Sequence, residues 1–167
     1  MTLNSLSKTA GNVMSSPPVV VNAGTPLREA AKVMVQHNIG CLPVVDDLGK
    51  FVGMITERTF QAELAGVKPD SALTPDQRVF EQLFVDAGTG LKRVEDRYLE
   101  SRNAPVESVM VSNEPTVSRE TPLWAVADAL LKSHLSHIAV VEDGKPVGVI
   151  ARHDLLRTYA NGDLISR

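Results

Sequence analysis

The sequence predicts a mixed α/β (α+β) fold in which two tandem β-α-β-β-α repeats flank a helical insert. The first observation is an internal repeat, because "VGMITERTF" from Val52 to Phe60 returns as "VGVIARHDL" from Val147 to Leu155. The second is its collinearity, since Val13-Met14 returns as Val109-Met110 and Thr25-Pro26-Leu27 as Thr121-Pro122-Leu123. The third is a change within each copy from strand-like to helix-like apolar spacing. One gap, at Leu48, keeps the copies aligned.

Each copy opens with a predicted strand and a predicted helix. The β-branched runs Val19–Val21 and Thr116–Val117 are typical of strands. A Thr-Pro pair follows, in which Thr suits the N-cap and Pro suits the first helical position. Apolar residues at helical spacing then mark one face of each helix: Leu27, Ala30, Ala31, Met34 and Asn38 in the first copy, and Leu123, Val126, Ala127, Leu130 and His134 in the second.

A hairpin and a second helix complete each copy. The hairpin strands are Leu42–Val45 with Phe51–Ile55, joined by "DDLGK", and Ile138–Val141 with Val147–Ile150, joined by "EDGK". Asp-Gly between apolar runs is a strong hairpin signal. The second helices begin near Thr56 and Ala151. These strands are too apolar for either face to be open to water.

The chain divides into five segments. They are a flexible N-terminus over 1–8, repeat 1 over 9–62, an insert over 63–104, repeat 2 over 105–160 and a C-terminal tail over 161–167. In the insert, "TPDQRVFEQLF" and "GLKRVEDRYLESR" have the spacing of two amphipathic helices. We expect a helical pair packed on the repeats, and the alternative is a mobile lid or a partner-docking element.

The composition limits the function classes. A net charge of −3 excludes a general nucleic-acid binder, which needs a basic face. A single cysteine, Cys41, excludes an internal disulfide and fits a reducing compartment. No apolar run is long enough for membrane insertion, and the first residues lack the apolar core of a signal peptide. We therefore expect a cytoplasmic protein.

The ordered set "VM", "TPL" and "PVVDDLGKFVGMIT", occurring twice, resembles the cystathionine β-synthase (CBS) domain, and the tandem pair resembles a Bateman module. The resemblance covers about residues 9–62 and 105–160. It implies that the repeats pack by their sheets about a pseudo-twofold axis. It also implies two clefts that bind adenine nucleotides or related ligands, and pairing of two modules into a homodimer.

The same resemblance implies that the two clefts differ. In the family the strand ends in Thr, and an Asp that binds the ribose hydroxyls follows after two further residues. The first repeat has Thr56 at the Thr position but Thr59 in place of the Asp, and the second has Ala151 in place of the Thr but keeps Asp154. Each cleft therefore has one half of the pair.

We expect the stronger site in the second repeat. Asp154 would hold the ribose, and Arg152 and His153 would attract phosphate at a helix N-terminus, together with His137. Thr116, Ile138 and Val149 would line the base. The weaker cleft, in the first repeat, consists of Val20, Cys41, Leu42, Met54, Thr56 and Thr59. The alternative is that Asp154 and Thr56 only cap their helices.

The predicted function is a stand-alone regulatory module that requires no cofactor. It would bind AMP, ADP, ATP or a related adenosine-containing ligand and transmit a conformational change to a separate regulated protein. The alternative is a structural dimerisation module with degenerate sites. A metal site at His134, His137 and His153 matches no zinc-binding spacing. A nucleotide hydrolase using His153 and Asp154 lacks a nucleophile and a phosphate loop, so we expect no enzyme activity.

Overall fold

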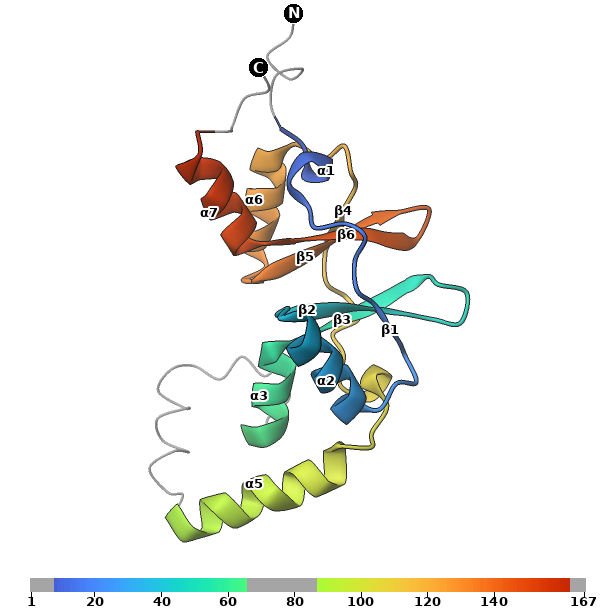
Figure 1. The fold of residues 1–167 in the computed structure, drawn as a ribbon, viewed down its shortest axis with the longest axis vertical. Coiled ribbons are helices and arrows are strands. Elements are labelled where there is room, and N and C mark those ends of the chain that lie inside the picture. The colour runs from blue at the N-terminus through green and yellow to red at the C-terminus, as the bar shows by residue number, and fades with distance from the viewer. Residues whose placement is uncertain (1–7, 66–86, 163–167) are drawn as a thin grey trace, which may run out of the picture.

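The computed structural model describes residues 8–65 and 87–162 (Figure 1). The helices in these ranges are α1 (Ala10–Val13), α2 (Leu27–His37), α3 (Glu57–Ala65), α5 (Ala87–Ser101), α6 (Leu123–Lys132) and α7 (Arg152–Ala160), with a 3-10 turn, η2 (Val106–Ser108). The strands are β1 (Val21–Asn22), β2 (Cys41–Val45), β3 (Phe51–Thr56), β4 (Thr116–Val117), β5 (His137–Glu142) and β6 (Lys145–Ala151). The helix expected at "TPDQRVFEQLF" and most of both expected terminal segments lie outside these ranges.

The strands form two sheets of the same topology. In the sheet β1-β2-β3 the first pair is parallel and the second antiparallel, and the sheet β4-β5-β6 repeats this arrangement. Figure 1 shows the two sheets face to face, with α2 and α3 on the outer side of one and α6 and α7 on the outer side of the other. The predicted α+β fold with two β-α-β-β-α repeats is confirmed.

The hairpin turns follow the turn chemistry of their sequences. Asp143 and Gly144 both have positive φ, 50° and 75°, as a two-residue turn between twisted strands requires. The first hairpin is one residue longer, and the Asp46 carboxylate accepts hydrogen bonds from the backbone N–H groups of Leu48 (2.9 Å) and Lys50 (2.8 Å). The extra residue Leu48 is 77% exposed, and the strand register is the same in both hairpins, since Val45 pairs with Phe51 where Val141 pairs with Pro146.

The starts of α2 and α6 differ from the prediction by one position. Pro26 and Pro122 are the N-caps, with φ near −60° and an extended ψ of 139° and 144°, and neither helix has a side-chain cap. The Thr121 hydroxyl instead accepts a hydrogen bond of 3.0 Å from the backbone N–H of Ser118. The prediction of a Thr N-cap was therefore wrong. A fixed φ near −65° suits Pro at this position.

The strands are apolar on both faces because each face packs against a different layer. Leu42, Val44 and Ile55 are fully buried against the helical layer of the first repeat. Ile138, Val140 and Ile150 are fully buried against the helical layer of the second repeat. The other strand face lies between the two sheets, where Cys41, Met54 and Ala139 form a third cluster with Phe51, Val141 and Val149.

The opening segment of each sequence repeat packs on the other repeat. Ala10 is fully buried in the core of the second repeat, and its N–H donates to the Thr121 carbonyl at 2.8 Å. Val106, in the corresponding position, is fully buried in the core of the first repeat. Ser15 pairs with Val149, and Val111 pairs with Met54 in the equivalent place. Each spatial unit therefore combines residues from both sequence repeats, in pseudo-twofold symmetry.

The second predicted helix of the insert is present as α5. Figure 1 shows α5 beside α3, on the outer side of the first repeat, and the two helices are in contact. The chain after α5 accepts hydrogen bonds from the first turn of α2. The N–H groups of Leu27 and Arg28 donate to the carbonyls of Ala104 (2.9 Å) and Arg102 (3.0 Å). The insert is thus anchored to repeat 1 at its C-terminal end.

Candidate functional site

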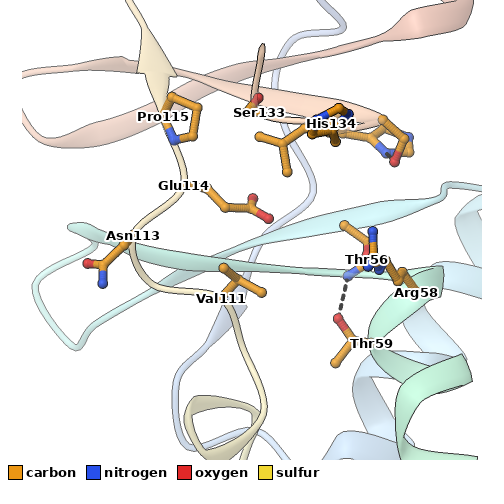
Figure 2. Close-up of a pocket in the computed structure, with 12 residues that line it drawn as sticks. Thr56, Arg58, Thr59, Val111, Asn113, Glu114, Pro115, Ser133 and His134 are labelled. Atoms are coloured by element: carbon orange, nitrogen blue, oxygen red, sulfur yellow. Dashed lines mark hydrogen bonds between the residues drawn. The ribbon is translucent and has the colours of Figure 1, made fainter. Parts of the chain in front are cut away.

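A pocket of about 360 Å³ lies between the two repeats, at the end of the sheets where β3 meets α3 (Figure 2). Three chain segments line it: the start of α3 from repeat 1, the connection that leads into β4, and the turn between α6 and β5 from repeat 2. The lining residues are Thr56, Arg58, Thr59, Val111, Asn113, Glu114, Pro115, Ser133, His134, Leu135, Ser136 and His137.

The first wall is the junction of β3 and α3. The backbone N–H of Thr56 donates to Thr59 Oγ1 at 3.0 Å, and Thr59 is only 2% exposed. Thr59 thereby satisfies a backbone donor at the start of the helix. Because the main chain of Thr56 makes this bond, its side-chain hydroxyl is not needed for the cap. Arg58, in the first turn, is exposed and brings a fixed positive charge to the pocket.

The second wall is the connection that bridges the sheets. Val111 exchanges two backbone hydrogen bonds with Met54, of 2.9 and 3.0 Å, which attaches the connection to β3. Thr116 pairs with Ala139, which attaches its other end to β5. Figure 2 shows the Glu114 side chain pointing into the space between the two repeats. The position of Glu114 is therefore set at both ends by sheet hydrogen bonds.

The third wall is the turn from Ser133 to His137. His134 has a positive φ of 55°, uncommon for a residue other than glycine. The Ser136 hydroxyl lies 2.9 Å from His137 Nδ1. The His137 ring lies against Gly40 of repeat 1, where a Cβ would be 3.0–3.1 Å from the ring. His137 therefore reaches across the boundary between the repeats.

The electrostatic surroundings of His137 favour the neutral ring. Burial lowers the pKa of His137 below its ordinary value. The carboxylates of Glu57 and Asp154 oppose this shift of the pKa, and the guanidinium of Arg152 adds to it. At neutral pH the ring of the ligand-free protein is thus available as a hydrogen-bonding group without a full charge.

The corresponding junction of repeat 2 does not line this pocket. Asp154 Oδ2 accepts a hydrogen bond of 2.8 Å from the N–H of Ala151, and Asp154 Oδ1 lies 3.6 Å from Arg157. Arg152 Nε donates to the Leu135 carbonyl at 2.7 Å. His153 is exposed. The observed contacts of Asp154 match the helix-capping alternative. Its contact with a ligand stays a prediction.

The structure distributes the predicted site residues over several environments. Thr56, Thr59 and His137 come together in the pocket, although the sequence argument placed them in two different clefts. Leu42 and Ile138 are fully buried in the repeat cores, and Cys41, Met54 and Val149 lie in the layer between the sheets. Val20 and Thr116 are exposed.

Cys41 has an environment that suppresses reactivity. Burial, together with the nearby carboxylates of Glu114, Asp154 and Glu57, raises the pKa of its thiol to about 12. A thiol in this state is neither a nucleophile nor a ready metal ligand at neutral pH. Within 8–65 and 87–162, no three His, Cys, Asp or Glu side chains gather as a metal site would require.

Sequence reasoning missed several pocket residues, namely Arg58, Asn113, Glu114, Ser133, His134 and Ser136. One signal could have found two of them. The repeat register sets "SNEPTV" (112–117) beside "SPPVVV" (16–21), so polar residues replace prolines just before the strand of the second copy. In the segments that the structure describes, no helix has the length and apolar character of a membrane span.

Comparisons with known proteins agree with this fold. Residues 10–66 and 106–161 match the CBS domain family. The CBS domain of a CBS domain-containing membrane protein from Sphaerobacter thermophilus is 31% identical, with a TM-score of 0.66 over 90% of this chain and 87% of that chain. The CBS domain pair of protein MJ0100, in complex with 5′-methylthioadenosine and S-adenosyl-L-methionine, has a TM-score of 0.66 over 93% of this chain and 98% of that chain, at 24% identity.

A curated relative is larger than this chain. The L-aspartate semialdehyde sulfurtransferase of Methanocaldococcus jannaschii is 26% identical over 149 residues, which are 89% of this chain but 22% of that protein. The match is therefore confined to a part of the enzyme, and its activity is not carried over. The repeated family match, the paired sheets and the structural similarity lead to one conclusion: the chain belongs to the CBS domain family and contains two CBS domains in tandem.

Proposed function

We propose that the chain is a regulatory module that binds an adenosine-containing ligand in the pocket between its repeats. The observation that carries the proposal is the origin of the pocket walls, because Thr56 and Arg58 come from repeat 1 and His137 from repeat 2. A ligand in contact with all three walls would couple the positions of the two repeats. The ligands in the related MJ0100 domain pair both contain adenosine, which supports this class.

The pocket has the chemistry of a small-molecule site. Its volume of about 360 Å³ falls at the lower end of the range for ligand pockets, roughly 300–1,000 Å³. Val111, Pro115 and Leu135 provide an apolar surface for a base. The Thr56 hydroxyl can hydrogen-bond a ligand, whereas the Ser133 hydroxyl already donates to the Ala129 carbonyl and the Ser136 hydroxyl lies beside His137 Nδ1. For a ligand with a phosphate, Arg58 carries a fixed positive charge, and the neutral His137 ring offers a hydrogen-bonding group.

The output of such a module would be a change in the relation of the two repeats. His137 lies against Gly40, and Lys50 Nζ donates to the Asp143 carbonyl at 2.6 Å, so the repeats touch at both ends of the sheet layer. A ligand that pulls the walls together would move these contacts, and we propose that a separate partner protein reads the movement. We place the module in the cytoplasm, without enzyme activity of its own.

A second candidate function, a structural dimerisation module, is favoured by a different observation. Four large apolar side chains on α6 and α7 are strongly exposed: Trp124 (68%), Leu131 (75%), Leu156 (60%) and Tyr159 (73%). Exposed apolar groups of this size mark interfaces when they are contiguous. Homodimerisation is compatible with ligand binding, so only a ligand titration separates the two functions.

The test is a calorimetric titration of the full chain with adenosine and AMP, using wild type and Thr56→Ala. The variant removes a pocket hydroxyl but keeps the backbone bond to Thr59, and repeat 2 already has alanine at this position. We expect saturable binding to wild type, and about 5- to 10-fold weaker binding to the variant, the value of a net hydrogen bond. Absence of binding at millimolar ligand would leave dimerisation as the function.

A further inference from the structure

The two pseudo-equivalent sites differ in where a carboxylate is found. In repeat 2 the acidic position of the helix start is Asp154, and in repeat 1 it is the neutral Thr59. The segment before the first strand of each repeat differs in the opposite way. Repeat 1 has the neutral Pro18 before β1, and repeat 2 has the acidic Glu114 at the equivalent position before β4. The bridges Ser15–Val149 and Val111–Met54 fix this register in the structure. Each site therefore keeps a carboxylate at one of these two positions, and a different element supplies it in each repeat.

The carboxylate of Glu114 is at the correct end of the pocket to compensate for Thr59. Its side chain points into the space between the repeats, on the side where Thr56 and Thr59 lie (Figure 2). Glu114, Thr56 and Thr59 all line the same pocket, so Glu114 and the β3–α3 junction face the same volume. Its anchored main chain limits the movement of the side chain out of that volume.

We propose that Glu114 is the acceptor for a vicinal diol in this pocket and so makes the site selective for ligands with an intact ribose. Both oxygens of a carboxylate accept hydrogen bonds, so one glutamate can bind the 2′- and 3′-hydroxyls together. In this arrangement Thr59 stays buried as the helix cap, and the acidic group comes from the connection between the sheets. The inference rests on the proposed function, because it assigns a role within the same pocket.

The experiment compares adenosine with 2′,3′-dideoxyadenosine by calorimetry, in wild type and in Glu114→Gln. The glutamine side chain has the size of glutamate but neither the charge nor the second acceptor oxygen. For wild type we expect adenosine to bind about 10- to 100-fold more tightly, the value of hydrogen bonds to a charged group. For Glu114→Gln we expect this ratio to fall to a few-fold, through weaker adenosine binding and unchanged binding of the dideoxy compound.

Glu107→Gln is the matched control, since Glu107 is exposed in η2, outside the pocket, and this variant should keep the wild-type ratio. The inference is overturned if Glu114→Gln also keeps the ratio, including the case in which both compounds bind equally more weakly through damage to the pocket. It is also overturned if wild type binds both compounds alike, and the proposed function then still stands. If neither compound binds wild type, the proposed function fails together with the inference.

Discussion

Asp154 Oδ2 accepts a hydrogen bond of 2.8 Å from the backbone N–H of Ala151, and this bond caps the N-terminus of α7. Asp154 is the residue that the family resemblance assigns to the ribose. Its observed partner is a backbone donor, as for Thr59 and Thr56 in the other repeat. Capping and ligand binding can therefore be separated by measuring stability and affinity on the same variants.

Asp154→Ala is expected to lower the free energy of unfolding by about 0.5–2 kcal/mol, because a helix N-terminal donor loses its acceptor. Asp154→Asn retains an acceptor oxygen and should lose less. Urea denaturation of the three proteins checks this. Equal stability of wild type and Asp154→Ala would show that the bond to Ala151 contributes nothing.

Gly53→Ala is expected to damage the fold more than Gly148→Ala does. At Gly53 the new Cβ would be 2.7 Å from the carbonyl oxygen of Val111, which accepts a hydrogen bond from the Met54 N–H. At Gly148 the nearest atoms belong to the flexible side chain of Met14, which can move. Overpacking of this kind costs about 1–3 kcal/mol.

Gly53→Ala should also weaken adenosine binding, since a displaced Val111 shifts the wall that contains Glu114. Thermal unfolding and a ligand titration of both glycine variants give the comparison. The opposite order of effects, with Gly148→Ala the more damaging, would contradict the interlocked packing described for Val111 and Met54.

The half-buried His137 predicts a stability loss at acid pH. Its pKa in the folded protein is lowered, chiefly by burial, from a reference near 6.5. Below pH 6.5 the unfolded chain gains a proton that the folded protein resists, so the free energy of unfolding falls as the pH is lowered toward the folded pKa. His137→Asn should reduce this fall. Denaturation at pH 7.5, 6.5 and 5.5 tests it, and identical pH profiles would contradict it.

The exposed apolar residues of α6 and α7 predict a homodimer in solution. We expect light scattering at micromolar concentration to give twice the monomer mass of 18.0 kDa. On the second helix of each repeat, Leu156 and Tyr159 are strongly exposed, Leu64 is 46% exposed, and Phe60 and Leu155 are partly buried. Leu156→Glu combined with Tyr159→Glu should give monomers, and a monomeric wild type would contradict the prediction.

The sequence predicts the repeat architecture well because its signals are local. Asp143-Gly144 specifies a turn, and the alternation that places Leu42 and Cys41 on opposite strand faces requires a layer on each side. It does not predict that Ala10 and Val106 complete the core of the other repeat, since that exchange depends on packing between segments distant in sequence. The Thr N-caps fail for a local reason, because Pro26 and Pro122 themselves fit the cap geometry.

The site is predicted less completely than the fold. Thr56 and His137 stand at positions that the family resemblance indicates, and the pocket includes both. Arg58 has no such signal, and Glu114 stands out only when its segment is set beside the prolines of the first repeat. A pocket with walls from both repeats cannot be read from either repeat alone.

A crystal structure of the full chain grown with adenosine tests the central claim most directly. The account predicts the nucleoside between the two repeats, with its base near Val111 and Leu135 and its ribose hydroxyls within hydrogen-bonding distance of Glu114. Density for adenosine beside Asp154 with this pocket empty, or no bound nucleoside in crystals soaked at millimolar concentration, would contradict it.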